Sequence, residues 1–145
     1  MTIFNYFAVS ENISTSGQPE ADQFSMIAES GHEVVINLAM PDHEKSIANE
    51  GELVTSQGMT YIHLPVPFNA PNEDHYAMFC RYMDSLANKR VWVHCIVNAR
   101  VSAFLFRYLQ DCRGYTAESA TTPVLEAWLP QMDSVWSEFI GRAPA

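Results

Sequence analysis

The stretch Val91-Trp92-Val93-His94-Cys95-Ile96-Val97-Asn98-Ala99-Arg100 decides the fold, because it joins a buried strand to a helix through a short loop. The apolar run over residues 91–93 predicts a strand covered on both faces. An apolar helix is expected from Val101 to Asp111, ending near Gly114. A strand, a tight loop and a helix in this order predict that backbone N–H groups converge on the loop and attract an anion.

Cys95 and Arg100 are the residues of this loop that can perform chemistry. Documented cysteines at helix N-termini have a pKa between about 3.5 and 7.5 instead of about 8.5, so we expect a nucleophile at Cys95. Arg100 carries a planar fork of donors that can hold two oxygens of a phosphate. Ser102 is placed to hydrogen-bond the thiolate, and His94 is expected to support the loop. The residues expected to bind phosphate are Ile96, Val97, Asn98, Ala99, Arg100 and Val101.

Outside this loop, apolar runs separated by turn residues predict alternating strands and helices. The expected strands cover residues 5–10, 33–39 and 60–66, with the second of these in the centre of the sheet. The expected helices cover residues 20–30 and 72–88, a segment ending near Gly58, and residues 116–140 with breaks at Pro123 and Pro130. This alternation predicts a single α/β domain over residues 1–145, with a mainly parallel central sheet flanked by helices and a helical C-terminus.

The composition narrows the possible functions. A net charge of −9 disfavours binding to nucleic acid or to an anionic membrane. The apolar runs are far shorter than the roughly 20 residues that cross a bilayer, and no basic leader precedes one, so we expect a cytoplasmic protein. Three cysteines without a close pair and five histidines without ligand spacing predict no disulfide framework and no metal site. No cofactor is expected, and the sequence does not indicate a protein partner.

The order His-Cys, a short loop, Arg and then Ser resembles the active-site segment of the protein tyrosine and dual-specificity phosphatases. Other landmarks resemble small bacterial members of this family, namely residues 13–19 (Ile-Ser-Thr-Ser-Gly-Gln-Pro), residues 34–38 and residues 61–66. The resemblance covers about residues 5–112 and implies the phosphatase fold. It also implies that Cys95 attacks phosphorus, that Arg100 and the loop amides hold the oxygens, and that a loop aspartate protonates the leaving group.

Two positions differ from the pattern of that family. Arg100 is the fifth residue after Cys95, whereas these phosphatases place the arginine sixth, and rhodanese-like sulfurtransferases have the shorter spacing. The general acid of the family corresponds in position to Asn69, whose amide cannot donate the proton. Asp42 and Asp74 are further candidates because their loops belong to the same edge of the sheet, although either is equally suited to cap a helix.

Three functions therefore remain open from the sequence. The first is a phosphatase-like protein that binds phosphate or a phosphorylated ligand in the Cys95 to Arg100 loop, with weak or absent hydrolysis of phosphotyrosine and other aryl phosphates. The second is a non-catalytic phosphate-binding or regulatory module of the same fold. The third is a rhodanese-like sulfurtransferase that carries a persulfide on Cys95.

Overall fold

One five-stranded sheet forms the centre of the computed structural model, which describes residues 2–141. Its strands are β1 (Phe7–Ala8), β2 (Ile13–Ser16), β3 (Val34–Asn37), β4 (Thr60–His63) and β5 (Val91–His94). Their order across the sheet is β1-β2-β5-β3-β4, and every pair is parallel except the short β1–β2 pair. This arrangement confirms the predicted, mainly parallel α/β fold.

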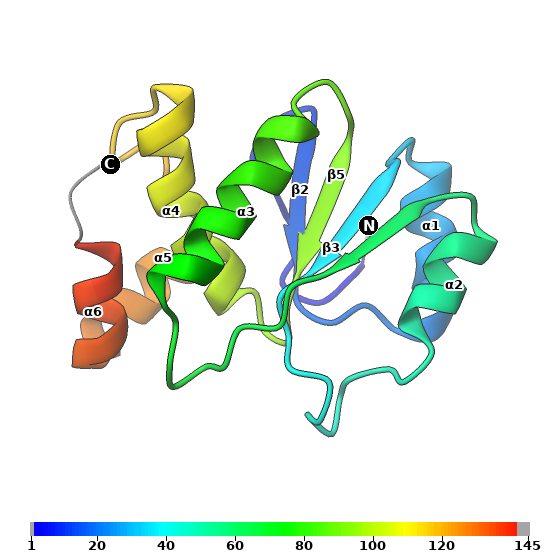
Figure 1. Ribbon diagram of the computed structural model, residues 1–145, viewed down its shortest axis with the longest axis horizontal. Coiled ribbons are helices and arrows are strands. Elements are labelled where there is room, and N and C mark those ends of the chain that lie inside the picture. The colour runs from blue at the N-terminus through cyan, green and yellow to red at the C-terminus, as the bar shows by residue number, and fades with distance from the viewer. Residues whose placement is uncertain (1, 142–145) are drawn as a thin grey trace.

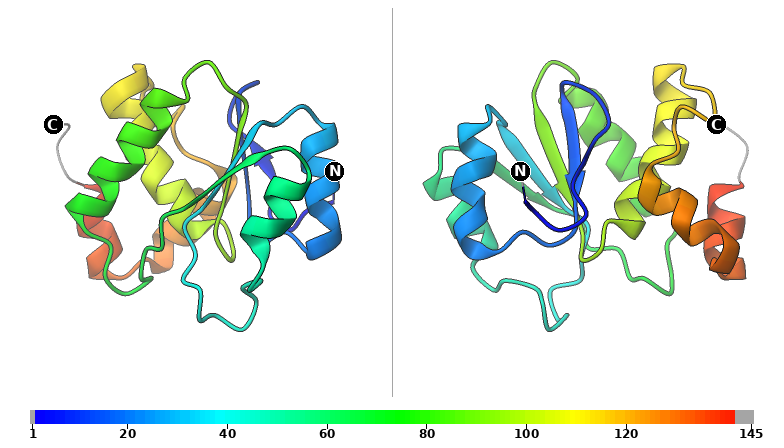
Figure 2. Two further views of the ribbon diagram at one scale, coloured as in Figure 1. Left: turned by 45° about the vertical axis from the view of Figure 1, so that its right-hand side comes forward. Right: turned by 180° about the vertical axis from the view of Figure 1, so that it is seen from behind.

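Helices cover both faces of the sheet (Figures 1 and 2). One face carries α1 (Phe24–Glu29), which follows a 3-10 turn at Ala21–Gln23, and α2 (Glu50–Ser56). The opposite face carries α3 (Glu73–Ser85) and α4 (Ala99–Arg113). The predicted helical C-terminus consists of α5 (Pro123–Trp128), a 3-10 turn at Leu129–Gln131 and α6 (Ser134–Ile140), which pack beyond α4. None of the helices within residues 2–141 has the length and apolar character needed to span a bilayer.

Strand β5 is the middle strand, and its side chains alternate between two hydrophobic cores. Trp92 lies in the smaller core beneath α1 and α2, with Phe24 and Val54. Val93 lies in the larger core beneath α3 and α4, where it joins residues such as Phe104. Because all four residues of β5 are buried, the strand that precedes the cysteine loop is fixed from both sides.

The fold differs from the sequence prediction in three places. The predicted strand over residues 5–10 is reduced to Phe7–Ala8, while residues 13–16, expected to lead into a turn, form β2. The central strand is β5, and β3 lies between it and the edge strand β4. Residues 116–122 form turns instead of a helix, and Pro123 begins α5 instead of interrupting a helix.

Strand β2 escaped prediction because its side chains are polar and yet buried. The hydroxyl of Thr15 donates to the carbonyl oxygen of Phe7 at 2.7 Å. The hydroxyl of Ser16 accepts from the indole nitrogen of Trp92 at 2.8 Å, and that of Ser14 lies 3.0 Å from His32 Nε2. Hydrogen bonds to distant residues therefore satisfy side chains that, in sequence, are typical of a loop.

Candidate functional site

The cysteine loop lies at the carboxyl end of the central strand, where β5 ends at His94 and α4 begins at Ala99. Asn98 precedes the helix with a φ of 74°, a left-handed conformation that asparagine tolerates better than most residues. This turn directs the loop into the N-terminus of a 15-residue helix, whose free N–H groups favour negative charge. The loops that follow β3, β4 and β5 gather along the lower edge of the sheet in Figure 1.

Arg100 is a buried cation, and the described part of the chain supplies it with no counter-ion. Only 5% of its surface is exposed, and it forms no ion pair within residues 2–141. Its Nη1 donates to the carbonyl oxygen of Val66 at 2.9 Å, and its Cζ lies 5.6 Å from the centre of the Phe68 ring. Its Nε is buried and has no hydrogen-bond partner among the described residues. A buried charge in this state is costly unless an anion completes its surroundings.

A pair of buried side chains, His94 and Glu50, lies behind the loop. His94 Nε2 is 2.7 Å from the Glu50 carboxylate, and the two side chains are 0% and 2% exposed. His94 Nδ1 is 3.1 Å from the carbonyl oxygen of Cys95. Each ring nitrogen thus has an oxygen of the protein within hydrogen-bond distance. The two contacts fix the orientation of the imidazole directly before Cys95.

Several groups hold the Glu50 carboxyl in its charged form. Burial by itself would raise its pKa, but the charge of His94 and hydrogen bonds from His94, Gln18 and Tyr61 outweigh that effect and hold the pKa below its ordinary value. Gln18 Nε2 donates to Glu50 Oε1 at 2.8 Å. Glu50 and Gln18 did not emerge from the sequence as site residues, because their partners are far away along the chain.

The segment Ser16-Gly17-Gln18-Pro19 holds the loop from the neighbouring strand. The backbone N–H of Gln18 donates to the carbonyl oxygen of Ile96 at 2.9 Å. A Cβ atom on Gly17 would lie 2.5 Å from the same oxygen, so the two backbones can approach only because residue 17 is glycine. This contact explains in physical terms why residue 17 of the 13–19 landmark is glycine, whereas the side chain of Gln18 is used in the hydrogen bond to Glu50.

The amino-terminal segment holds the loop from the other side. Asn98 Nδ2 donates to the carbonyl oxygen of Asn5 at 2.9 Å and to the hydroxyl of Thr15 at 3.0 Å. In return, Asn5 Nδ2 donates to the carbonyl oxygen of Val97 at 2.8 Å. We call this reciprocal pair the asparagine clasp. It fixes the backbone of the loop at residues 97 and 98.

Ser102 also supports the clasp. Its hydroxyl donates to Asn98 Oδ1 at 3.4 Å and accepts from the hydroxyl of Thr122 at 2.6 Å. These hydrogen bonds connect Ser102 to the residue that caps α4, rather than to Cys95. In this structure Ser102 therefore positions Asn98, and its predicted hydrogen bond to a thiolate remains a prediction.

The comparisons with known proteins agree with this geometry. Residues 11–111 match the family described as "Polymorphic toxin system, DSP-PTPase phosphatase". The chain belongs to this phosphatase family. The DUF442 protein of Shewanella putrefaciens CN-32 is 30% identical, with a TM-score of 0.86 over 96% of this chain and 90% of that one. No curated protein matches the sequence.

More distant phosphatases share the fold. TpbA of P. aeruginosa, solved in complex with pTyr, has a TM-score of 0.75 at 14% identity. The PP-IP phosphatase SIW14 of S. cerevisiae, solved in complex with citrate, has a TM-score of 0.77 at 13% identity. Each match covers 97% of this chain and 85% of the other. The predicted resemblance to the tyrosine and dual-specificity phosphatases is thereby confirmed, and the comparisons do not favour a sulfurtransferase.

A cavity of about 440 Å³ opens at the cysteine loop. Its walls are Met40, Asp42, His43, Phe68, Ile96, Val97 and Arg100. Of the three predicted candidates for the general acid, Asp42 is the one that lines this cavity together with Arg100. Asp74 lies in the first turn of α3, and Asn69 follows the wall residue Phe68. His43 is a wall residue that the sequence did not single out.

The three cysteines of the chain have different surroundings. Cys95 is fully buried and contributes no surface to the cavity. Burial raises the pKa of the Cys80 thiol to about 11. Burial and the nearby Asp84 carboxylate raise the pKa of the exposed Cys112 thiol. Cys80 and Cys112, on α3 and α4, are thus held as neutral thiols at neutral pH.

Proposed function

We propose that this member of the phosphatase family binds phosphate, or a phosphate monoester, in the Cys95 to Arg100 loop and hydrolyses aryl phosphates slowly. The observation that carries the proposal is the environment of Arg100, a buried guanidinium with an unpartnered Nε and no counter-ion within residues 2–141. It lies in the first turn of α4, where the helix N–H groups also favour an anion. A phosphoryl group would satisfy both at once.

The reaction proceeds through a covalent intermediate. The Cys95 thiolate attacks phosphorus, a sulfur–phosphorus bond forms, and the bond from phosphorus to the ester oxygen breaks. Asp42 in its acid form donates a proton to the departing oxygen. Water then attacks the phosphocysteine and gives a proton to the Asp42 carboxylate, the sulfur–phosphorus bond breaks, and phosphate, the thiolate and the acid form of Asp42 are restored. Arg100 and the loop amides hold the non-bridging oxygens throughout, and the helix N-terminus favours the thiolate.

Two features support slow turnover. The sulfur of Cys95 has no exposed surface, so the loop must move before it can reach phosphorus. The loop is also one residue shorter than in the phosphatases it resembles, which removes an N–H donor. Losing one donor of an oxyanion site costs roughly 2.7–4 kcal/mol, or about 10²–10³ in rate. Binding of the ground state suffers less than hydrolysis.

The ligands of the more distant relatives agree with this proposal. TpbA was solved with pTyr, and PTPMT1 was solved with PI(5)P. Both ligands carry a phosphate monoester group. For this chain we infer the same general class of ligand, without choosing either compound.

Replacing Arg100 by lysine tests the proposal, because lysine keeps the charge but loses the planar fork. Calorimetry with inorganic phosphate or vanadate is expected to show affinity at least about tenfold weaker, the cost of losing a charged hydrogen bond. Arg107→Lys is the matched control, since Arg107 is 4% exposed on the same helix but pairs with Glu73. Equal affinity in the Arg100 variant and the unmodified protein would refute the proposal.

A further inference from the structure

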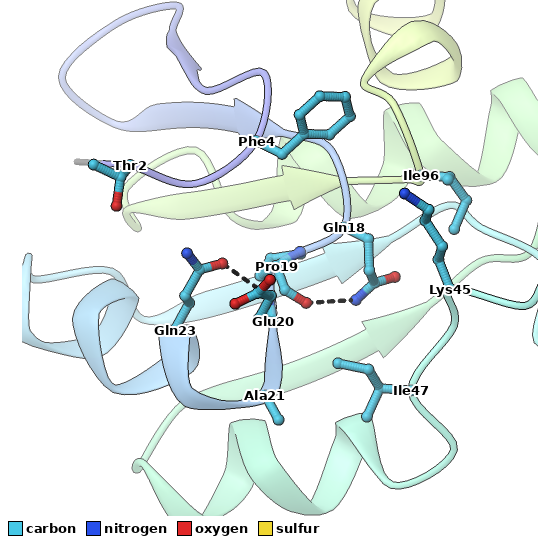
Figure 3. Close-up of a pocket in the computed structure, with 10 residues that line it drawn as sticks. All are labelled: Thr2, Phe4, Gln18, Pro19, Glu20, Ala21, Gln23, Lys45, Ile47 and Ile96. Carbon is cyan, nitrogen blue, oxygen red and sulfur yellow. Dashed lines mark hydrogen bonds between the residues drawn. The ribbon is translucent and has the colours of Figure 1, made fainter.

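A second hollow, of about 580 Å³, lies next to the cysteine loop (Figure 3). Its walls include Phe4, Gln18, Lys45, Ile47 and Ile96. Ile96 also lines the cavity at Arg100, so the two hollows meet at this side chain. The segment 40–47 contributes to both, through residues 40, 42 and 43 on one side and residues 45 and 47 on the other. A ligand that extends from the loop over Ile96 would enter the second hollow.

Lys45 is the cation of this hollow. The side chain is exposed, and within residues 2–141 its ammonium forms no ion pair or hydrogen bond. In Figure 3 the nitrogen end of Lys45 extends toward Ile96, the residue shared with the loop cavity. The backbone N–H of Lys45 donates to His43 Nδ1 at 3.0 Å, which ties its backbone to a wall residue of that cavity.

Glu20 is an acidic wall residue of the same hollow, and its carboxylate is bonded within its own turn. The Glu20 carboxylate accepts a hydrogen bond from the backbone N–H of Gln23, at the start of the 3-10 turn. In Figure 3 Glu20 lies on the opposite side of Gln18 from Lys45. Of the charged residues that line this hollow, Lys45 is therefore the one nearest the loop.

We propose that this hollow receives the organic part of the ligand, and that Lys45 pairs with a second anionic group on it. The ligand class is then a phosphate ester that carries a further phosphate or carboxylate. The inference rests on the proposed function, because the first anionic group is the phosphate held at Arg100. Two cations without counter-ions at one edge of an acidic protein are complementary to a ligand with two negative ends.

Two pairs of probes test this inference, and each pair differs in one anionic group. The short pair is glycerol 3-phosphate and 3-phosphoglycerate, and the long pair is fructose 6-phosphate and fructose 1,6-bisphosphate. Calorimetry on the Cys95→Ser protein measures binding without turnover. In at least one pair, the probe with two anionic groups is expected to bind up to about fivefold more tightly, as for an exposed ion pair. About 0.5 M salt should remove most of this preference.

Lys45→Gln is expected to abolish the preference while leaving the affinity for inorganic phosphate unchanged. Lys89→Gln is the matched control. Lys89 is also a lysine on the surface, but it pairs with Glu33 and lies just before the amino end of β5, away from the cysteine loop. Loss of the preference in the Lys45 variant, and its retention in the Lys89 variant, would support the inference.

Two results would overturn the inference, and they can be told apart. If inorganic phosphate binds the Cys95→Ser protein but neither probe pair shows a preference that depends on Lys45, the inference fails and the proposed function stands. If inorganic phosphate does not bind at all, and Cys95 hydrolyses no phosphate ester in the unmodified protein, the proposed function fails and this inference fails with it.

Discussion

The carboxylate of Glu50 lies 2.7 Å from His94 Nε2, directly behind the loop that is proposed to bind an anion. A buried carboxylate in this position would oppose an anion if it were unpaired. Here the carboxylate is paired with the imidazole of His94, and the imidazole is the member of the pair that lies next to Cys95. The pair therefore keeps the carboxylate from facing the loop unpaired, and both members are needed for it.

Glu50→Gln is expected to lower the free energy of unfolding by about 3–5 kcal/mol at neutral pH, because it removes one partner of a buried, hydrogen-bonded pair. Urea denaturation measures this loss. In the unmodified protein the folded-state pKa of Glu50 lies below the ordinary value of 4.5. The stability from Glu50 is therefore complete above about pH 4.5 and is lost as the pH falls through the lower, folded-state pKa. The variant should lack this part of the acid dependence.

The double variant Glu50→Gln, His94→Asn is the control for this prediction. It removes both partners, so its loss of stability should be smaller than the sum of the two single losses. Strictly additive losses would contradict an interaction between the two side chains.

Cys95 is expected to be alkylated faster than Cys112 at about pH 6, because the loop N–H groups and the helix N-terminus favour a negative charge at its sulfur. Cys112 should react slowly, since its raised pKa keeps the thiol neutral. Iodoacetamide labelling with mass mapping gives both rates. Equal rates at the two cysteines would contradict the prediction.

Asp42→Asn is expected to slow the hydrolysis of phenyl phosphate by at least about tenfold, because general acid catalysis typically contributes about 10²–10⁴ when the leaving group needs a proton. The hydrolysis of p-nitrophenyl phosphate, whose leaving group is stable as an anion, should change much less. Initial rates with both substrates at high enzyme concentration test this difference. Asp74→Asn is the matched control, and a larger effect in that variant would instead assign the acid to α3.

A glycine inserted between Ile96 and Val97 is expected to raise the hydrolysis of p-nitrophenyl phosphate by at least about tenfold, since it adds one N–H donor to the loop. Val97 is 42% exposed, which leaves room for the longer loop. The same insertion combined with Cys95→Ser should be inactive. Rapid hydrolysis that depends on Cys95 in the unmodified protein would show that loop length does not limit the rate.

The sequence is sufficient to predict the parts of the site that are local. Strand β5, the cysteine loop and α4 are contiguous, and their apolar pattern and the glycine at 114 depend on neighbours within a few residues. The cap of α3 is local in the same way, since the side chain of Asn72 accepts from the backbone N–H of His75, three residues later, at 2.8 Å. These features follow from short-range rules of helix and strand formation.

The site residues that the sequence did not predict depend on contacts between distant segments of the chain. Glu50 reads as an ordinary acid at a helix start, and only the fold places it beside His94, 44 residues away. Gln18 and Glu50 are 32 residues apart. In each case the side chain alone is uninformative, because its role depends on a partner that another loop supplies.

The asparagine clasp also determines when the site can form as the chain is made. Asn5 forms hydrogen bonds with Val97 and Asn98, which come 92 and 93 positions later in the chain. At about 5–20 residues per second, the ribosome needs on the order of 5–20 s to add that many residues. Throughout this interval β2 has no β5 to pair with, and contacts of such long range form slowly. A nascent chain therefore carries an amino-terminal segment without its partner until residues 97 and 98 have been made, and the anion loop cannot be held in place before then.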